Sequence, residues 1–253
     1  MTAKHGGLAK LWLLNLFGNA ALLACVYIWL LLPDAHGWQV AGSALLALAV
    51  IFCGLWLRAG SFAYFRLSEF RENAAVWKAF RHSLHRLVAL AVWAIPFFGI
   101  EWWLLSLRRY TPQFGVWLWQ KAPVLRFGSP RAIYHASNDI LLLCMGLLAA
   151  VWLPAATTVA ARGFSRNMSS SWRVLKQRSY WLWFVLLAVV GGYLPYKLVW
   201  WIPDLNTVNQ QAWSAGLRFF LAYVLLICAW VALLLVVGER VESVEATSGN
   251  AGQ

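Results

Sequence analysis

The sequence has few charged residues and very few acidic ones. Only 12% of the 253 residues are Asp, Glu, Lys or Arg, and nine of these are acidic. A water-soluble domain carries about 25% charged residues, because its surface has to be hydrated. Hydrophobic residues instead make up 62% of the chain, and the mean hydropathy is +0.63. This composition excludes an ordinary soluble protein and predicts an integral membrane protein.

The sequence also lacks the short motifs that identify common enzyme classes. It contains neither of the phosphate-binding patterns GxxxxGK[ST] and GxGxxG, no HExxH zinc motif and no GxSxG nucleophile motif. No polar stretch is long enough to form a nucleotide-binding domain. We therefore expect no cofactor, no metal and no catalytic residues.

The few cysteines are never spaced as CxxC, and each lies in an apolar segment. Zinc sites and redox pairs need such short spacings, whereas single cysteines in apolar helices serve as small packing residues. We expect neither a disulfide nor a metal site among Cys25, Cys53, Cys144 and Cys228.

Six apolar segments are each long enough to cross a bilayer, which takes about 20 helical residues at a rise of 1.5 Å. Backbone groups in hydrocarbon must bond within their own segment, so the predicted fold is an all-α, polytopic membrane helix bundle. The first segment is too long for a signal peptide, and we expect an uncleaved span. One transmembrane domain covers 1–238, and the polar residues 239–253 are expected to be a disordered cytoplasmic tail. The predicted spans are 11–32, 39–57, 87–107, 139–161, 181–202 and 215–238.

The distribution of basic residues predicts the orientation of these spans. Short loops rich in Lys and Arg stay in the cytoplasm, and 14 of the 21 basic residues fall on the amino-terminal side of the bundle. We therefore expect both termini to be cytoplasmic. The exception is the outer loop 108–138, which carries five basic residues that this topology does not explain.

The segment Val76–Arg86 combines an apolar stripe with basic residues. From Phe70 to Leu87, apolar residues recur at steps of four and three, which places them on one face of a helix. We expect this helix to lie in the membrane interface, with Trp77 as an anchor and its cations near anionic lipid headgroups. The predicted headgroup contacts here are Lys78, Arg81 and Arg86.

A second segment, Ser171–Arg178, repeats this pattern. Its interfacial anchor is Trp172, and its predicted headgroup contacts are Arg173, Lys176 and Arg178. The basic excess therefore lies at membrane edges beside Trp and Tyr, which favour the interface. Anionic lipid is the expected partner, and nucleic acid is not.

These two segments belong to a longer internal repeat. WKAFR at Trp77 and WRVLK at Trp172 are ninety-five residues apart, and AGSFAYFR ahead of the first aligns with AATTVAAR ahead of the second. The following spans also contain corresponding helix interruptions. These are Pro96 and Gly99 in the third span, and Gly191, Gly192 and Pro195 in the fifth.

The repeated unit of amphipathic segment and span covers most of the chain. In this layout the chain resembles the six-span membrane domain that accompanies some bacterial glycerophosphoryl diester phosphodiesterases, and the uncharacterised stand-alone relatives of that domain. The resemblance implies a bacterial plasma-membrane protein. It assigns no functional residue, since no catalytic motif of the family is present.

The clearest ionisable residues inside predicted spans, each one or two turns from the outer end, are Glu101, Lys197 and Arg218. A lone charge in hydrocarbon costs several kcal/mol, so such residues pair or reach a polar surface. Because Lys197 follows Glu101 by nearly one repeat length, we predict that Glu101 contacts Lys197 or Arg218. This contact would close the outer end of the bundle, the alternative being that each side chain extends separately to the interface.

Two groups of polar residues leave an enzymatic alternative open. His82 and His85 share one helix face, but neighbouring cations oppose metal binding, so we expect them to fill the polar face. Arg131, His135 and Asp139 follow one another at four-residue steps, faintly like the Arg, His and Asp of membrane phosphatidic-acid phosphatases. The other motifs of that family are missing, so a helix start capped by Ser137 or Asn138 is the preferred interpretation.

The sequence therefore supports three functional hypotheses. The preferred one is a lipid-associating protein or an assembly partner in a membrane complex, including a homo-oligomer. The second is a small transporter with a site at the interrupted spans three and five. A membrane enzyme resembling a lipid phosphatase is the third.

Overall fold

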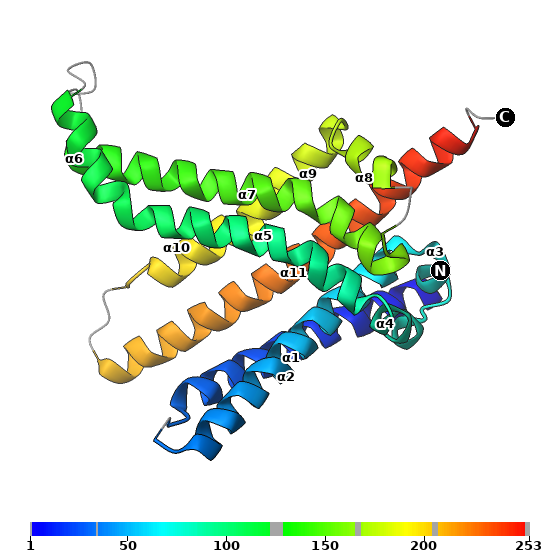
Figure 1. Ribbon diagram of the computed structural model, residues 1–253, viewed down its shortest axis with the longest axis horizontal. Helices are drawn as coiled ribbons and strands as arrows, with labels where there is room; N and C mark the ends of the chain where they lie inside the picture. Colours follow the sequence, from blue (N-terminus) through cyan, green and yellow to red (C-terminus); the bar gives the residue numbers. More distant parts are fainter. Residues whose placement is uncertain (1, 34, 122–128, 165–167, 204–206, 251–253) are drawn as a thin grey trace. The chain divides into compact units, whose positions relative to one another are not determined.

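The computed structural model describes every residue except 1, 34, 122–128, 165–167, 204–206 and 251–253. The described part consists of helices joined by short connections, without strands (Figure 1). Six helices are long and apolar enough to cross a membrane, which confirms the predicted all-α bundle and a multi-pass membrane protein. They are α1 (Thr2–Leu31), α2 (Gly37–Arg66), α5 (Leu87–Leu107), α7 (Pro130–Arg162), the run α9 (Arg178–Ala188), η3 (Val189–Tyr193) and α10 (Leu194–Trp200), and α11 (Val208–Asn250).

Short helices connect the long ones: α3 (Ser68–Glu72), α4 (Val76–Leu84), η1 (Arg108–Tyr110), α6 (Thr111–Lys121) and α8 (Met168–Val174). The chain divides into two compact units, which are described separately. Unit 1 comprises residues 1–90 and 154–253, and unit 2 comprises residues 91–153.

The core of unit 1 lies where α2, α4, the end of α7 and α11 meet. All eight residues from Ala59 to Arg66 are buried, and so are all eight from Pro154 to Ala161. Close packing here requires small residues. A Cβ on Gly238 of α11 would lie 2.3 Å from the backbone oxygen of Phe65, so α11 approaches the end of α2 with no room for a side chain.

Helix α4 confirms that the first basic segment is helical from Val76 to Leu84, whereas His85 and Arg86, also predicted to be helical, form a turn before α5. The packed face of α4 also differs from the predicted stripe. It lies against α2, where the Trp56 side chain donates a hydrogen bond to the Phe80 carbonyl oxygen at 3.0 Å. Trp77 remains 68% exposed. The buried residues of α4 are Val76, Ala79, Phe80 and Ser83. The predicted stripe follows hydrophobicity alone, whereas this packed face includes the small residues Ala79 and Ser83, which allow close approach.

The second basic segment is shorter as a helix than predicted. Helix α8 ends at Val174, residues 175–177 form a turn, and Arg178 begins the next spanning helix. The prediction of one helix over Ser171–Arg178 was therefore wrong at its carboxyl end. Gln177, the residue directly before α9, has an extended backbone conformation. The extended backbone at this position prevents α8 from continuing into α9.

The expectation of a disordered tail from residue 239 was wrong as far as Asn250, where α11 ends. Apolar and acidic residues in this segment share a helical spacing, and both find partners. Val237 and Val241 are buried, and Glu242 and Glu245 form ion pairs with other helices of unit 1. Burial and pairing offset the entropy of ordering this polar sequence.

In unit 2, most of the predicted outer loop 108–138 is helical where it is described. Arg108 donates a hydrogen bond to Asn138 Oδ1 at 2.6 Å, and the backbone at Gly115 approaches Tyr134. Helix α7 begins at Pro130, with Ser129 Oγ accepting the Ala132 N–H at 3.2 Å. A Ser-Pro start is favourable for helices, so the predicted cap at Ser137 or Asn138 was wrong.

Candidate functional site

The most highly connected polar group of unit 1 is an ion-pair cluster at the ends of three long helices. Helix α2 ends in Arg66, α7 ends in Arg162, and the last turns of α11 supply Glu242 and Glu245. Arg71 comes from the short helix α3. Five of the nine acidic residues in the chain lie in the neighbouring segments 69–72 and 239–245.

Glu245 is the centre of this cluster. Its Oε1 accepts a hydrogen bond from Arg66 Nη2, one from Arg162 Nη1 at 3.0 Å and one from Ser170 Oγ at 3.0 Å. Arg66 is only 1% exposed, and its Nε also reaches Thr158 Oγ1 at 3.4 Å. A buried guanidinium requires such partners, because desolvation of a single charge costs several kcal/mol. Glu245 therefore holds the ends of α2, α7 and α8 together.

The two arginines that share Glu245 close the aligned peptides AGSFAYFR and AATTVAAR. Arg66 and Arg162 thus correspond in the predicted internal repeat, and both follow a fully buried run of small and apolar residues. A cleft of about 410 Å³ opens beside them. Its lining includes both arginines together with Glu69, Glu242 and Glu245.

The six predicted headgroup contacts have a different environment. All six are exposed, and no carboxylate lies within ion-pair distance of any of them in the described part of the chain. The anchors beside them, Trp77 and Trp172, are 68% and 41% exposed. The six cations are Lys78, Arg81 and Arg86 around α4, and Arg173, Lys176 and Arg178 around α8.

A second polar network lies within the spanning helices of unit 1. Asn15 of α1 is fully buried and donates a hydrogen bond to Ser61 Oγ of α2 at 3.0 Å. Arg58 of α2 donates to Asn19 Oδ1 at 2.7 Å, and its guanidinium lies 4.8 Å from the ring centroid of Trp230 on α11. The network therefore connects α1, α2 and α11 without a carboxylate. Polar contacts of this kind fix helix pairs in hydrocarbon.

The three intramembrane charges predicted to meet are distributed over both units. Glu101 belongs to unit 2, whereas Lys197 and Arg218 belong to unit 1. Within unit 1, Lys197 Nζ lies 5.5 Å from the Tyr193 ring centroid, and Arg218 Nε donates to the Ser214 carbonyl oxygen at 3.1 Å. The contact of Glu101 with either cation remains a prediction.

The predicted helix interruptions have different structural outcomes. Pro96 and Gly99 lie inside α5, which continues to Leu107. In the fifth span, Gly191 and Gly192 form part of the π-helical turn η3, and Pro195 follows near the start of α10. A Cβ on Gly191 would lie 2.5 Å from the Ala229 side chain, so this turn permits close contact with α11.

Three histidines, His82, His85 and His135, occupy unrelated positions. His82 Nε2 lies 2.8 Å from the Ala161 carbonyl oxygen and so connects α4 with the end of α7, whereas His85 is exposed. His135 lies on α7 in unit 2, where Arg131 Nε is 3.4 Å from its Nε2. The described residues contain no group of three or more His, Cys, Asp or Glu side chains that could hold a metal ion.

Sequence reasoning missed both polar groups of unit 1. It placed Arg58 in a loop, because the second span was ended at Leu57, and it assigned Glu245 to a disordered tail. Helical spacing was the available signal for both. Asn15 and Asn19 are four residues apart, Arg58 and Ser61 are three apart, and Val241 and Glu245 are four apart.

Comparison of the chain with protein-family models, with curated proteins and with solved structures finds no match.

Proposed function

We propose that this chain is a lipid-associating integral membrane protein that contacts anionic headgroups through the cations around α4 and α8. The observation that carries the proposal is the separation of the basic side chains into two groups. One group, Arg66, Arg71 and Arg162, forms ion pairs with the carboxylates of Glu242 and Glu245. The six exposed cations have no such partner among the described residues, and they lie beside exposed tryptophans.

This arrangement suits a membrane surface for electrostatic reasons. Each Lys or Arg near an anionic leaflet contributes about 1 kcal/mol of attraction, provided that it is not already neutralised by a carboxylate. Indole rings prefer the same depth, because one edge is apolar and the N–H is polar. The orientation included in the proposal, with both termini cytoplasmic in a bacterial plasma membrane, rests on the basic residues and on the resemblance of layout.

Lipid preference can be measured by native mass spectrometry of the protein released from bilayer discs of mixed phosphatidylglycerol and phosphatidylcholine. The decisive variant carries Arg81→Gln, Arg86→Gln, Arg173→Gln and Arg178→Gln. We expect its preference for phosphatidylglycerol to fall at least about fivefold relative to the unsubstituted chain, from the attraction of four surface cations.

The matched control replaces the same four arginines by Lys, which keeps the charge, and should retain the preference. An unchanged preference in the Gln variant would show that these cations do not select the lipid. Loss of the preference in the Lys variant as well would indicate altered folding rather than lost charge.

A small transporter is the second candidate, and the π-helical turn Val189–Tyr193 favours it, because π-turns occur frequently at functional sites. Substitution of Gly191 by Ala provides the test. A packing role predicts lower stability, since Ala229 lies against this glycine. A transport role predicts in addition that the substitution changes the flux of a cargo across the membrane. This change must exceed what the loss of stability or of folded protein explains.

A further inference from the structure

Two adjoining pockets form a groove between α1 and α11, with a charged end and an apolar end. The first has a volume of about 320 Å³ and the second about 470 Å³. Leu8 of α1 and Leu235 of α11 line both of them, so the two pockets adjoin each other at these residues. We define the α1–α11 groove by the residues that line either pocket.

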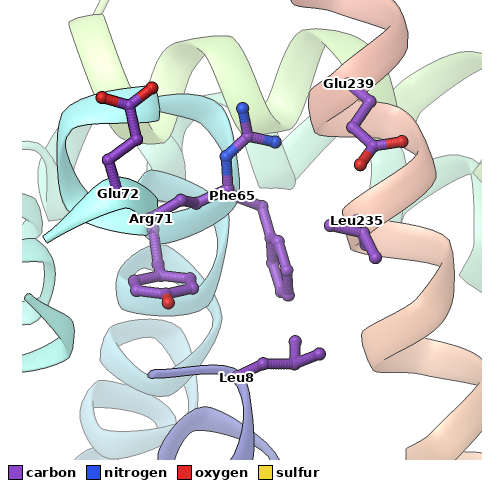
Figure 2. Close-up of a pocket in the computed structure, with 7 residues that line it drawn as sticks. Leu8, Phe65, Arg71, Glu72, Leu235 and Glu239 are labelled. Atoms are coloured by element: carbon purple, nitrogen blue, oxygen red, sulfur yellow. The ribbon is translucent and has the colours of Figure 1, made fainter. Parts of the chain in front are cut away.

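The charged end is formed by α3 and α11. Figure 2 shows Glu72 and Glu239 on opposite sides of the opening, Phe65 between them and Leu8 at the far end. Arg71 also lines this end, where its guanidinium is already paired with Glu242. Neither Glu72 nor Glu239 forms an ion pair within the described ranges of the chain. The unneutralised charge at this end of the groove is therefore negative.

The apolar end follows both helices into the predicted hydrocarbon region. It is lined by Ala9 and Trp12 of α1 and by Cys228, Val231 and Ala232 of α11. The polar atoms here satisfy one another, since Trp12 Nε1 donates to Cys228 Sγ at 3.3 Å. Glu239 and Cys228 are separated by about 16 Å along α11 at 1.5 Å per residue. This length matches half of a hydrocarbon layer about 30 Å thick.

From this geometry we infer that the α1–α11 groove binds one phospholipid with a primary ammonium headgroup, such as phosphatidylethanolamine. An acyl chain can lie along the groove, whose length from Glu239 to Cys228 is about that of one leaflet. The ammonium group complements the free carboxylates of Glu72 and Glu239, and Arg71 can donate a second hydrogen bond to the lipid phosphate. The inference rests on the proposed lipid association and extends it. The exposed cations select a negative headgroup charge, whereas this groove selects the positive ammonium group.

The test compares two lipids that are both zwitterionic, so the surface cations that select anionic lipid do not affect the result. The full-length protein is placed in bilayer discs with equal amounts of phosphatidylethanolamine and phosphatidylcholine. The lipids that remain bound after release are then counted by native mass spectrometry. We expect one retained phosphatidylethanolamine, because its ammonium group donates hydrogen bonds that the trimethylated headgroup of phosphatidylcholine lacks.

Two variants address the charged end. Glu72→Gln combined with Glu239→Gln should reduce the preference for phosphatidylethanolamine about fivefold, as expected for two partly exposed charge contacts. Glu69→Gln is the matched control, since Glu69 lies on the same short helix but does not line the groove. Persistence of the preference in the double variant, or its absence from the unsubstituted chain, would overturn the assignment.

Two further variants address the apolar end. Ala232→Trp should fill the groove and abolish retention of the lipid, whereas Leu226→Trp, on the same helix but outside the groove, should not. If Ala232→Trp fails to fold, Ala232→Leu supplies a smaller substitution at the same position, which should also reduce retention of the lipid.

Unchanged retention of the lipid in a folded Ala232 variant would contradict lipid occupancy. A dimer that forms in both lipids without a retained lipid would also overturn the inference and assign the groove to a second copy of the chain. The outcome is separate from that of the proposed function. Loss of the phosphatidylglycerol preference leaves this comparison unchanged, and failure here leaves the role of the exposed cations intact.

Discussion

Two sets of basic side chains at the same end of unit 1 differ in burial and in partners. Arg66 is 1% exposed and shares Glu245 with Arg162, whereas Arg81 and Arg173 are exposed without a carboxylate nearby in the described structure. A buried charge must be paired, and a surface charge need not be. The comparison teaches that the buried arginines hold helices together, while the exposed arginines remain available to an external anion.

The largest expected effect follows from removal of the shared carboxylate. Glu245→Gln should lower the free energy of unfolding by about 3–5 kcal/mol, because it leaves Arg66 buried without a counterion. Reversible unfolding of the protein in a neutral bilayer measures this loss. Glu242→Gln is the matched control on the same helix, and should cost about 1 kcal/mol or less, since Glu242 and Arg71 are partly exposed. Equal losses for the two variants would contradict the special position of Glu245.

A second prediction concerns the end of α11. With Glu242→Gln and Glu245→Gln combined, the amide hydrogens of residues 239–250 should exchange at least about tenfold faster, because a helix end without tertiary contacts opens readily. The internal control is the apolar part of the same helix around Leu234, which should exchange as before. Unchanged exchange in 239–250 would mean that the helix end is stable by itself.

The network within the spanning helices should contribute less. A double-mutant cycle with Arg58→Met and Asn19→Leu is expected to give a coupling energy of about 0.5–1.7 kcal/mol, the range measured for side-chain hydrogen bonds between membrane helices. The cycle is needed because removal of Arg58 also removes a desolvated charge, which can offset the lost contact. A coupling energy near zero would exclude a stabilising role for this pair.

The six spans could be predicted from the sequence, because a run of apolar residues has one stable form in a bilayer. The third span, 87–107, coincides with α5 at both ends. Helix ends were less predictable where tertiary contacts decide them. Helix α2 continues past Leu57 because Arg58 and Arg66 find partners on α1, α7 and α11. Helix α11 continues past Gly238 because Glu242 and Glu245 form ion pairs with arginines of other helices.

The candidate sites could be predicted only in part for the same reason. The exposed cations around α4 and α8 follow from local periodicity, which the sequence contains. The Glu245 cluster depends on residues 66, 162 and 245, and no local pattern shows that segments so distant meet. Alignment of AGSFAYFR with AATTVAAR predicts that Arg66 and Arg162 correspond in an internal repeat, but it gives no sign of a shared carboxylate.

The most direct measurement is the gain in unfolding free energy when phosphatidylglycerol replaces phosphatidylcholine in the bilayer. A lipid that binds the folded state stabilises it, and we expect a gain of about 1 kcal/mol for the unsubstituted chain, as for a surface cation near an anionic leaflet. The variant with Gln at 81, 86, 173 and 178 should keep its stability in the neutral bilayer within about 0.5 kcal/mol and lose the gain. Glu245→Gln, although much less stable, should keep the full gain. Retention of the gain in the first variant, or its loss in the second, would contradict the separation of the basic residues into structural and lipid-binding sets.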